Sequence, residues 1–282
     1  VMYQIFPDRF CSSGKMHDNV PSDRVMREWG ELPYYKPDQN GHVWNNDYFG
    51  GDLDGIRSKL DYLKDLGVTC IYLNPIFESH ENHRYNTANY RNVDPLLGTN
   101  EDFRELCKAA KTYGISVILD GVFSHTGADS IYFNKFGRYH APGAYQSEKS
   151  PYYSWYHFWG NKEYESWWGI DTLPNVDENN PSYTKYICGD DGVLDYWLSL
   201  GAAGYRLDVA DELPDNLRAC VKKFDEEKIV IGEVWEDASN KEAYGVKRRY
   251  LLGDQLDSVM NYPFREAIIA YMKGEAATTF RD

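Results

Sequence analysis

The chain has 282 residues, of which 42% are hydrophobic and 26% charged, the composition of an ordinary globular protein. Its net charge of −14 argues against nucleic acid as a partner, because nucleic-acid binding requires basic patches, and against anionic membrane surfaces. No apolar run approaches the roughly 20 residues that span a bilayer. Because the net charge is strongly negative, a neutral substrate fits best. An aromatic content of 16% indicates either rings that stack on sugars or an aromatic-rich core.

The five cysteines are scattered along the chain and form no Cys-x-x-Cys pair; they are Cys11, Cys70, Cys107, Cys188 and Cys220. Their odd number and spacing predict free thiols rather than a disulfide framework or a zinc site, with Cys70 and Cys107 in the core. Free thiols favour a cytoplasmic over a secreted protein, and no signal peptide is visible.

Strand-like and helix-like segments alternate along the chain. Apolar runs predict strands at residues 2–6, 70–73, 115–119, 205–209, 229–232 and 256–260. Helical spacing predicts helices at residues 55–66, 101–114, 192–200, from 214 onward, in the Lys- and Arg-rich stretch before the sixth strand, and from 264 to a fading end at 274–279.

Repeated strand–helix units imply a parallel sheet with helices outside it. A doubly wound sheet is one alternative. Polar residues at the ends of several separate strands favour a TIM barrel, whose active site collects residues from all its strand-to-helix loops. Residues 126–178 carry no clear period and interrupt the alternation, which predicts an inserted segment after the third strand.

Two carboxylates stand where apolar strands end: Asp208 after the run at 204–207, and Glu233 after the run at 229–232. Packing does not explain them, because burying an unpaired charge costs several kcal/mol or more. Two acids on successive strands predict one shared site, as in a glycosidase with a nucleophile and an acid/base. Asp120 and His125 follow the third strand in the same way.

Arg206 lies two residues before Asp208, so both side chains face the same way on a strand. We expect Arg206 to keep Asp208 ionised, as a nucleophile requires, and the apolar setting of Glu233 to keep that acid protonated. The alternative is that Arg206 and Asp208 form a buried structural ion pair and that Glu233 is a helix-start residue.

The chain resembles the α-amylase superfamily, glycoside hydrolase family 13, over nearly its whole length. The motifs that carry the resemblance are Tyr3-Gln-Ile-Phe-Pro-Asp-Arg-Phe10, Gly50-Gly-Asp-Leu53, Asp120–His125, Leu173-Pro-Asn-Val-Asp177, Gly204–Glu212, Gly232–Glu236 and Met260-Asn-Tyr-Pro-Phe264. Residues 209–212 and 260–264 are most similar to the neopullulanase, cyclomaltodextrinase and maltogenic amylase branch.

The resemblance implies a (β/α)8 barrel with a small domain B inserted at residues 126–178. It also implies a retaining hydrolase of α-linked glucans such as cyclomaltodextrin, pullulan or starch oligosaccharides. Asp208 is implied as the nucleophile that forms a covalent glycosyl-enzyme, and Glu233 as the acid/base. Retention predicts carboxyl groups about 5–5.5 Å apart.

The resemblance also implies substrate-binding roles for Tyr85, His125, Arg206, Asp211, Glu212 and Trp235. Tyr85 and His125 are expected at the ring on the cleaved side, and Arg206 beside the nucleophile. Trp235 and the Asp211–Glu212 pair are expected on the leaving-group side. A half-buried loop tyrosine and a core tryptophan are the alternatives for Tyr85 and Trp235. His83, equally a solvated loop histidine, is left out of the site.

No cofactor and no metal ligand are predicted, although calcium stays an alternative. The family usually has Asn where this chain has Ser124, and that Asn commonly helps to bind calcium. The loop after Phe10 also lacks the dense Asn/Asp pattern of the branch's calcium loop, and a hard cation needs several oxygen ligands.

The family's seventh-strand motif, with a His and a third carboxylate, does not occur before Asp282. We therefore expect residues 1–282 to form a truncated catalytic barrel with about six of eight βα units, poorly stable and nearly inactive alone. A homodimer of a longer parent is left open. An α-glucanotransferase, a sugar-binding protein and a transporter-subunit relative remain alternatives to a hydrolase.

Overall fold

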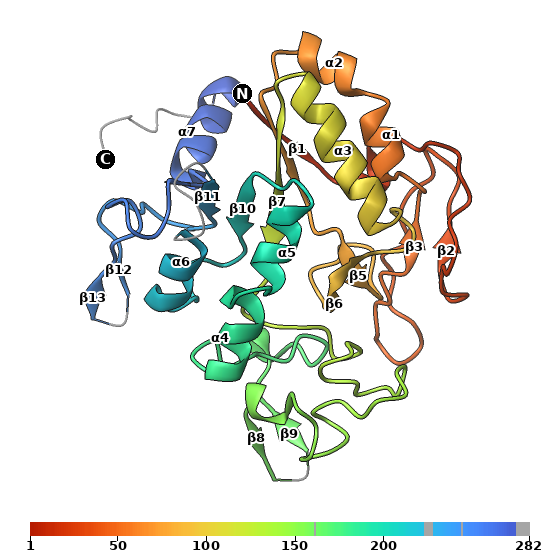
Figure 1. The fold of residues 1–282 in the computed structure, drawn as a ribbon, viewed down its shortest axis with the longest axis vertical. Helices are drawn as coiled ribbons and strands as arrows, with labels where there is room; N and C mark the ends of the chain where they lie inside the picture. The colour runs from red at the N-terminus through yellow and green to blue at the C-terminus, as the bar shows by residue number, and fades with distance from the viewer. Residues whose placement is uncertain (161, 223–227, 244, 275–282) are drawn as a thin grey trace.

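A computed structural model describes residues 1–160, 162–222, 228–243 and 245–274 (Figure 1). Its centre is a curled sheet of six strands in the order β1-β4-β7-β10-β11-β14, every neighbouring pair parallel. The strands are β1 (Met2–Ile5), β4 (Cys70–Leu73), β7 (Ser116–Gly121), β10 (Gly204–Leu207), β11 (Ile229–Gly232) and β14 (Ser258–Val259). All six lie within one or two residues of their predicted bounds, and the parallel sheet is confirmed.

Seven α-helices occur within the described residues: α1 (Leu53–Arg57), α2 (Leu60–Asp65), α3 (Asn100–Thr112), α4 (Pro181–Cys188), α5 (Val193–Ser199), α6 (Asp215–Lys222) and α7 (Tyr262–Lys273). A capping box between Thr99 and Asp102 starts α3. The single helix predicted at residues 55–66 is wrong, because α1 ends at Arg57, with Ser58 as its C-cap, and α2 begins at Leu60. The Ser58 hydroxyl donates to the Gly55 carbonyl at 2.7 Å, a local bond that competes with helix continuation.

The two faces of the sheet differ in character. Ile71, Val117, Leu207 and Val230 belong to the main hydrophobic core. The opposite face has a small apolar cluster centred on Cys70, Tyr72 and Ile118, packed against Ile229 and Ile231. Arg206 and Asp120 are paired in register across β10 and β7 on this second face. Charged residues therefore follow the apolar ones towards the carboxyl ends of the strands.

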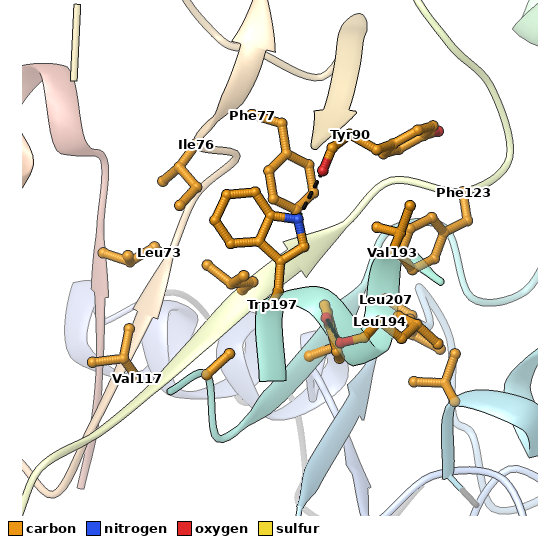
Figure 2. Packing of buried hydrophobic residues seen from close by; sticks show 14 of the residues in the cluster. Leu73, Ile76, Phe77, Tyr90, Val117, Phe123, Val193, Leu194, Trp197 and Leu207 are labelled. Atoms are coloured by element: carbon orange, nitrogen blue, oxygen red, sulfur yellow. Dashed lines mark hydrogen bonds between the residues drawn. The ribbon is translucent and has the colours of Figure 1, made fainter. Parts of the chain in front are cut away.

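Trp197 of α5 lies at the centre of the main core (Figure 2). Its ring lies 4.9 Å from that of Phe77, and its indole N–H donates to the Tyr90 carbonyl at 2.7 Å. The Tyr90 hydroxyl in turn donates to the carbonyls of Val122 and His125. The core thus fixes the backbone that leaves β7.

Among its described residues, the segment between β7 and α4 holds only short elements: β8 (Phe158–Trp159) paired antiparallel with β9 (Glu163–Tyr164), and 3₁₀ turns at Tyr153–Trp155 and Trp167–Gly169. Figure 1 shows this hairpin beyond α4, away from α1 and α2. Buried rings of the segment, including Tyr132, Phe133 and Trp155, belong to the same core as the sheet. Its division as a separate domain at residues 126–178 stays a prediction.

The helix predicted in the Lys- and Arg-rich stretch before the sixth strand is wrong. The described residues there form a hairpin of β12 (Glu242–Ala243) and β13 (Val246–Lys247). Gly245 has a φ of +73°, which a turn tolerates and a right-handed helix does not. The predicted fading of the last helix at 275–279 lies outside the described residues.

Four further strands were not predicted: β2 (Val25–Met26), β3 (Asp47–Tyr48), β5 (Phe77–Ser79) and β6 (Thr87–Val93). Cys70 and Cys107 are buried as predicted, and none of the five cysteines forms a disulfide. Within the described residues, no helix is long and apolar enough to cross a membrane.

Candidate active site

Three carboxylates lie at the carboxyl ends of three adjacent strands. Asp120 is the second-last residue of β7, and Asp208 and Glu233 directly follow β10 and β11. The sheet's hydrogen bonding continues through both: Asp208 N–H donates to the Gly121 carbonyl at 3.0 Å, and Glu233 N–H to the Leu207 carbonyl at 2.9 Å. The sheet therefore fixes the backbone of all three acids.

The Arg206 guanidinium connects the three carboxylates. Its Nη1 lies 2.8 Å from oxygens of both Asp120 and Asp208, and its Nη2 lies 2.9 Å from Glu233 Oε2. The Arg206 side chain is only 5% exposed. A planar guanidinium is the side chain best suited to hold several carboxylates in a fixed arrangement.

Val209, directly after Asp208, has a φ of +38°, an unusual conformation for a β-branched residue. This conformation lets its N–H donate to Glu233 Oε2 at 2.9 Å. The other Glu233 oxygen accepts from the Tyr262 hydroxyl at the start of α7, at 3.0 Å. Backbone strain of this kind persists where the surroundings fix it, commonly at functional sites.

The proton distribution differs from the one predicted from the sequence. Burial raises the pKa of Asp208 to about 8, and the nearby Asp120 and Glu233 carboxylates add to this. Burial acts to raise the pKa of Glu233 too, but Arg206 and hydrogen bonds from Val209, Trp235 and Tyr262 hold it below its ordinary value. The expectation of an ionised Asp208 and a protonated Glu233 is wrong for this structure. One guanidinium faces three carboxyl groups, and Glu233 takes more of the available donors.

Asp120 has hydrogen-bond partners besides Arg206. Its second oxygen accepts from the hydroxyls of Tyr72 and Tyr85, the latter at 3.1 Å. The Tyr85 hydroxyl also accepts from Asn74 at 3.0 Å. The Tyr85 ring stacks with that of His83 at 6.0 Å, and both residues line the cavity described below.

His125 is buried, and both of its ring nitrogens have partners. Nε2 lies 3.0 Å from the Tyr85 carbonyl and Nδ1 lies 2.9 Å from the Ser124 hydroxyl. A carbonyl only accepts, so Nε2 carries the hydrogen and Ser124 donates to Nδ1. Burial lowers the pKa of His125 to about 4, so the ring is neutral near neutral pH. In this structure His125 holds the backbone of Tyr85.

A cavity of about 290 Å³ opens above these groups. Its lining contains six of the eight predicted site residues, together with four others: Tyr85, His125, Arg206, Asp208, Glu233 and Trp235, and His83, Trp167, Leu173 and Val209. The side chains predicted to act together are therefore brought to one place by segments far apart in the sequence.

Asp211 and Glu212 do not line this cavity. Asp211 accepts from the Tyr250 hydroxyl at 2.7 Å and pairs with Lys241 at 2.5 Å. Both Glu212 oxygens accept indole N–H groups, from Trp167 at 2.8 Å and from Trp168 at 3.1 Å. Substrate contacts by these two acids stay predictions, since both carboxylates already have partners within the protein.

Five residues of the site lie outside the predicted set: Asp120, His83, Val209, Trp167 and Leu173. Asp120 stands at the end of a predicted strand, as Asp208 does, and the same signal identifies it. The sequence does not distinguish His83 from a solvated loop histidine, but it lies two residues from Tyr85 and lines the cavity. Trp167 and Leu173 come from the aperiodic segment, where no sequence signal indicated which aromatic or apolar residue reaches the site.

The loop after Phe10 contacts two buried carboxylates, Asp52 and Asp54, through Ser13, Lys15 and His17. Asp54 of α1 pairs with Lys15 of this loop and with Arg57. Asp52 accepts from His17 at 2.9 Å and from the Gly55 N–H at 2.6 Å. Both carboxylates thus have cationic or hydrogen-bonding partners within the chain, and the prediction of no metal ligand stays a prediction.

A curled parallel sheet with a group of carboxylates at the carboxyl ends of its strands is typical of α/β glycoside hydrolases. Comparisons with known proteins agree. Residues 4–281 match the alpha-amylase family, described as "Alpha amylase, catalytic domain". The chain therefore belongs to the alpha-amylase family of glycoside hydrolases.

The chain is 42% identical to an amylopullulanase of Thermoanaerobacterium saccharolyticum, over 98% of this chain and 24% of the relative. It is 38% identical to a cyclomaltodextrinase of Thermoanaerobacter pseudethanolicus, over 96% of this chain and 44% of the relative. The solved structure of the type III pullulan hydrolase from Thermococcus kodakarensis aligns with a TM-score of 0.80 at 31% identity, over 97% of this chain and 48% of that one. The chain thus spans less than half of these relatives.

Proposed function

We propose that the protein is a retaining hydrolase of α-glucans in which Asp208 is the nucleophile and Glu233 the acid/base. The observation that carries this is the placement of both carboxyl groups in one cavity, on opposite nitrogens of the Arg206 guanidinium. The names of the relatives, amylopullulanase and cyclomaltodextrinase, support an α-glucan substrate.

In the first step, an Asp208 oxygen attacks the anomeric carbon while the glycosidic C–O bond breaks and Glu233 gives its proton to the departing oxygen. In the second step, Glu233 takes a proton from water as the water oxygen attacks the same carbon and releases Asp208. The reactive form therefore has Asp208 ionised and Glu233 protonated. In the proposal, substrate binding moves the one proton of the pair from Asp208 to Glu233, as Glu233 exchanges its protein donors for the glycosidic oxygen.

The glycone side of the cavity is the side of Tyr85 and His125. In the proposal, the Tyr85 ring stacks under the sugar that Asp208 attacks, since its hydroxyl is already fixed by Asp120 and Asn74. His125 keeps the Tyr85 backbone in place and contacts the same sugar from the cavity wall.

The test measures reducing ends released from cyclomaltodextrin, pullulan and starch by the full-length protein. Asp208→Asn should lower kcat at least about 10³-fold and leave substrate binding, measured by calorimetry, largely intact, because the amide keeps the size of the side chain and loses the nucleophile. The matched control is Asp254→Asn, an exposed carboxylate paired with Arg249. An Asp208→Asn protein with the wild-type rate would overturn the assignment.

A further inference from the structure

Two half-buried cysteines lie next to each other on neighbouring helices. Cys188 is the last residue of α4, and Cys220 lies in the last turn of α6. The two helices contact each other, as Figure 1 also shows, and a hydrogen bond joins the two thiols. Neither cysteine forms a disulfide in this structure, so the pair is present in its reduced form.

The hydrophobic core holds both thiols in place. Cys188 packs against the main core and follows the buried Ile187. On α6, Leu217 and Val221 are buried in the same core on either side of Cys220. Because the core anchors both helices, the two sulfur atoms stay together without the ordering of a loop. Groups held in contact in this way react as an intramolecular pair, far faster than the same groups free in solution.

The surroundings of the pair favour a disulfide over a metal site. Among the residues that the structure describes, no group of three or more His, Cys, Asp and Glu side chains is placed to hold a metal ion. Cys188 and Cys220 are both partly exposed, so a small oxidant can reach them, whereas Cys70 and Cys107 are buried. The sulfur of Cys11, also half-buried, contacts oxygens of the neighbouring serines 12 and 58 instead.

We infer that Cys188 and Cys220 form a redox modification site, at which a small-molecule disulfide such as oxidised glutathione converts the two thiols into a crosslink between α4 and α6. The Cys220 thiolate attacks one sulfur of glutathione disulfide and breaks its S–S bond, and the released glutathione takes up the proton that Cys220 lost. The Cys188 sulfur then attacks the Cys220 sulfur of the mixed disulfide, and the second glutathione leaves with the Cys188 proton. The two protein thiols are oxidised, and glutathione disulfide is reduced to two thiols.

Cys188 acts second in this sequence because its thiol keeps its proton more firmly. Its hydrogen bond to Cys220, and then its burial, raise the pKa of Cys188 above the ordinary value. The thiolate is the nucleophile in disulfide exchange, so the first attack falls to Cys220.

The crosslink joins two segments that reach the candidate active site. Arg218, two residues before Cys220, donates to the carbonyls of Ala210, at 2.9 Å, and of Leu213, and so connects α6 to the loop after Asp208. On the other side, α4 directly follows the segment inserted after β7. No step of the modification involves the glucan, so this inference does not depend on the proposed function.

The experiment incubates the full-length protein with excess glutathione disulfide at about pH 8, blocks the remaining thiols with N-ethylmaleimide and digests the protein with trypsin without reduction. Mass spectrometry should find the tryptic peptides 186–206 and 219–222, which contain Cys188 and Cys220, joined in one ion. The thiol count should fall by two per chain, and dithiothreitol should restore both thiols. The linked peptide should form at least about tenfold faster in the folded protein than in urea-unfolded protein.

Cys188→Ser and Cys220→Ser should each abolish the linked peptide. Cys11→Ser is the matched control, a half-buried cysteine outside α4 and α6, and it should leave the yield of the linked peptide unchanged. Glutathione on both Cys188 and Cys220 without a link between them would overturn the site, as would two unmodified thiols after oxidation. Equal rates of linkage in the folded and the unfolded protein would also overturn it, because the contact between α4 and α6 would then play no part.

Discussion

The Arg206 guanidinium lies 2.9 Å from Glu233, the acid that the sequence had placed in an apolar setting without a charged partner. The same group lies 2.8 Å from Asp208. The same guanidinium thus contacts both the proposed nucleophile and the proposed acid/base. With hydrogen bonds from Val209 and Tyr262 added on the Glu233 side, the shared proton rests on Asp208.

This sharing predicts the alkaline limit of activity. The pKa of Asp208 is raised to about 8, so the pair keeps one proton up to that pH and loses it above. Catalysis requires one proton on the pair, and kcat/KM should therefore fall about tenfold per pH unit above roughly pH 8. The acid limb should lie below the ordinary pKa of a glutamate, because the pKa of Glu233 is lowered. A pH–rate profile of the full-length protein that declines from pH 6 upward would contradict this.

Asp129 predicts a pH-dependent stability. The carboxyl is buried, its Oδ1 has no partner among the described residues, and burial raises its pKa from 3.8 to about 6. The folded state therefore holds this proton more tightly than the unfolded state, and stability falls as the pH rises from about 4 through 6. Asp129→Asn removes that loss, so the variant should exceed the wild type by about 1–3 kcal/mol at pH 8 and by little at pH 4.

Denaturant unfolding of both proteins at the two pH values checks this expectation. Arg138 Nε lies 3.7 Å from Asp129 Oδ2, and a strong ion pair there would reverse the sign. A variant less stable than the wild type at pH 8 would show that the charge of Asp129 stabilises the fold. Asp254→Asn, on an exposed carboxylate, should show no such difference between pH 4 and pH 8.

Trp197→Phe should destabilise the fold by about 2–3 kcal/mol. The change leaves a cavity in the main core and removes the indole donor from the buried Tyr90 carbonyl. Trp159→Phe, on an exposed ring, should stay within about 0.5 kcal/mol of the wild type. Chemical denaturation measures both, and equal stabilities of the two variants would contradict the packing described around Trp197.

The sheet was largely predictable from the sequence because its strands are short apolar runs with clear ends. The strands at 70–73 and 229–232 have the predicted bounds, and the acids after β10 and β11 lie in one cavity. Chain spacing on a single strand also predicted the contact between Arg206 and Asp208.

Contacts between strands and between distant segments could not be predicted from the sequence. The pairing of Arg206 with Glu233 depends on the register of β10 against β11, which sets Arg206 beside Ile231. The partners of Glu212 lie some 45 residues earlier in a segment without periodicity. Which carboxyl group holds the proton depends on all the neighbours of three buried carboxyl groups. The sequence motif around Asp208 indicated only one of these neighbours, Arg206.

The most direct test of the proposed mechanism is to trap its covalent intermediate. The full-length protein is incubated with 5-fluoro-α-glucosyl fluoride, digested with pepsin and sequenced by tandem mass spectrometry. The account predicts one added fluoroglucosyl mass on the peptide that contains Asp208, and none in Asp208→Asn. A label on Glu233, or turnover of α-glucan with inversion at the anomeric carbon, would contradict it.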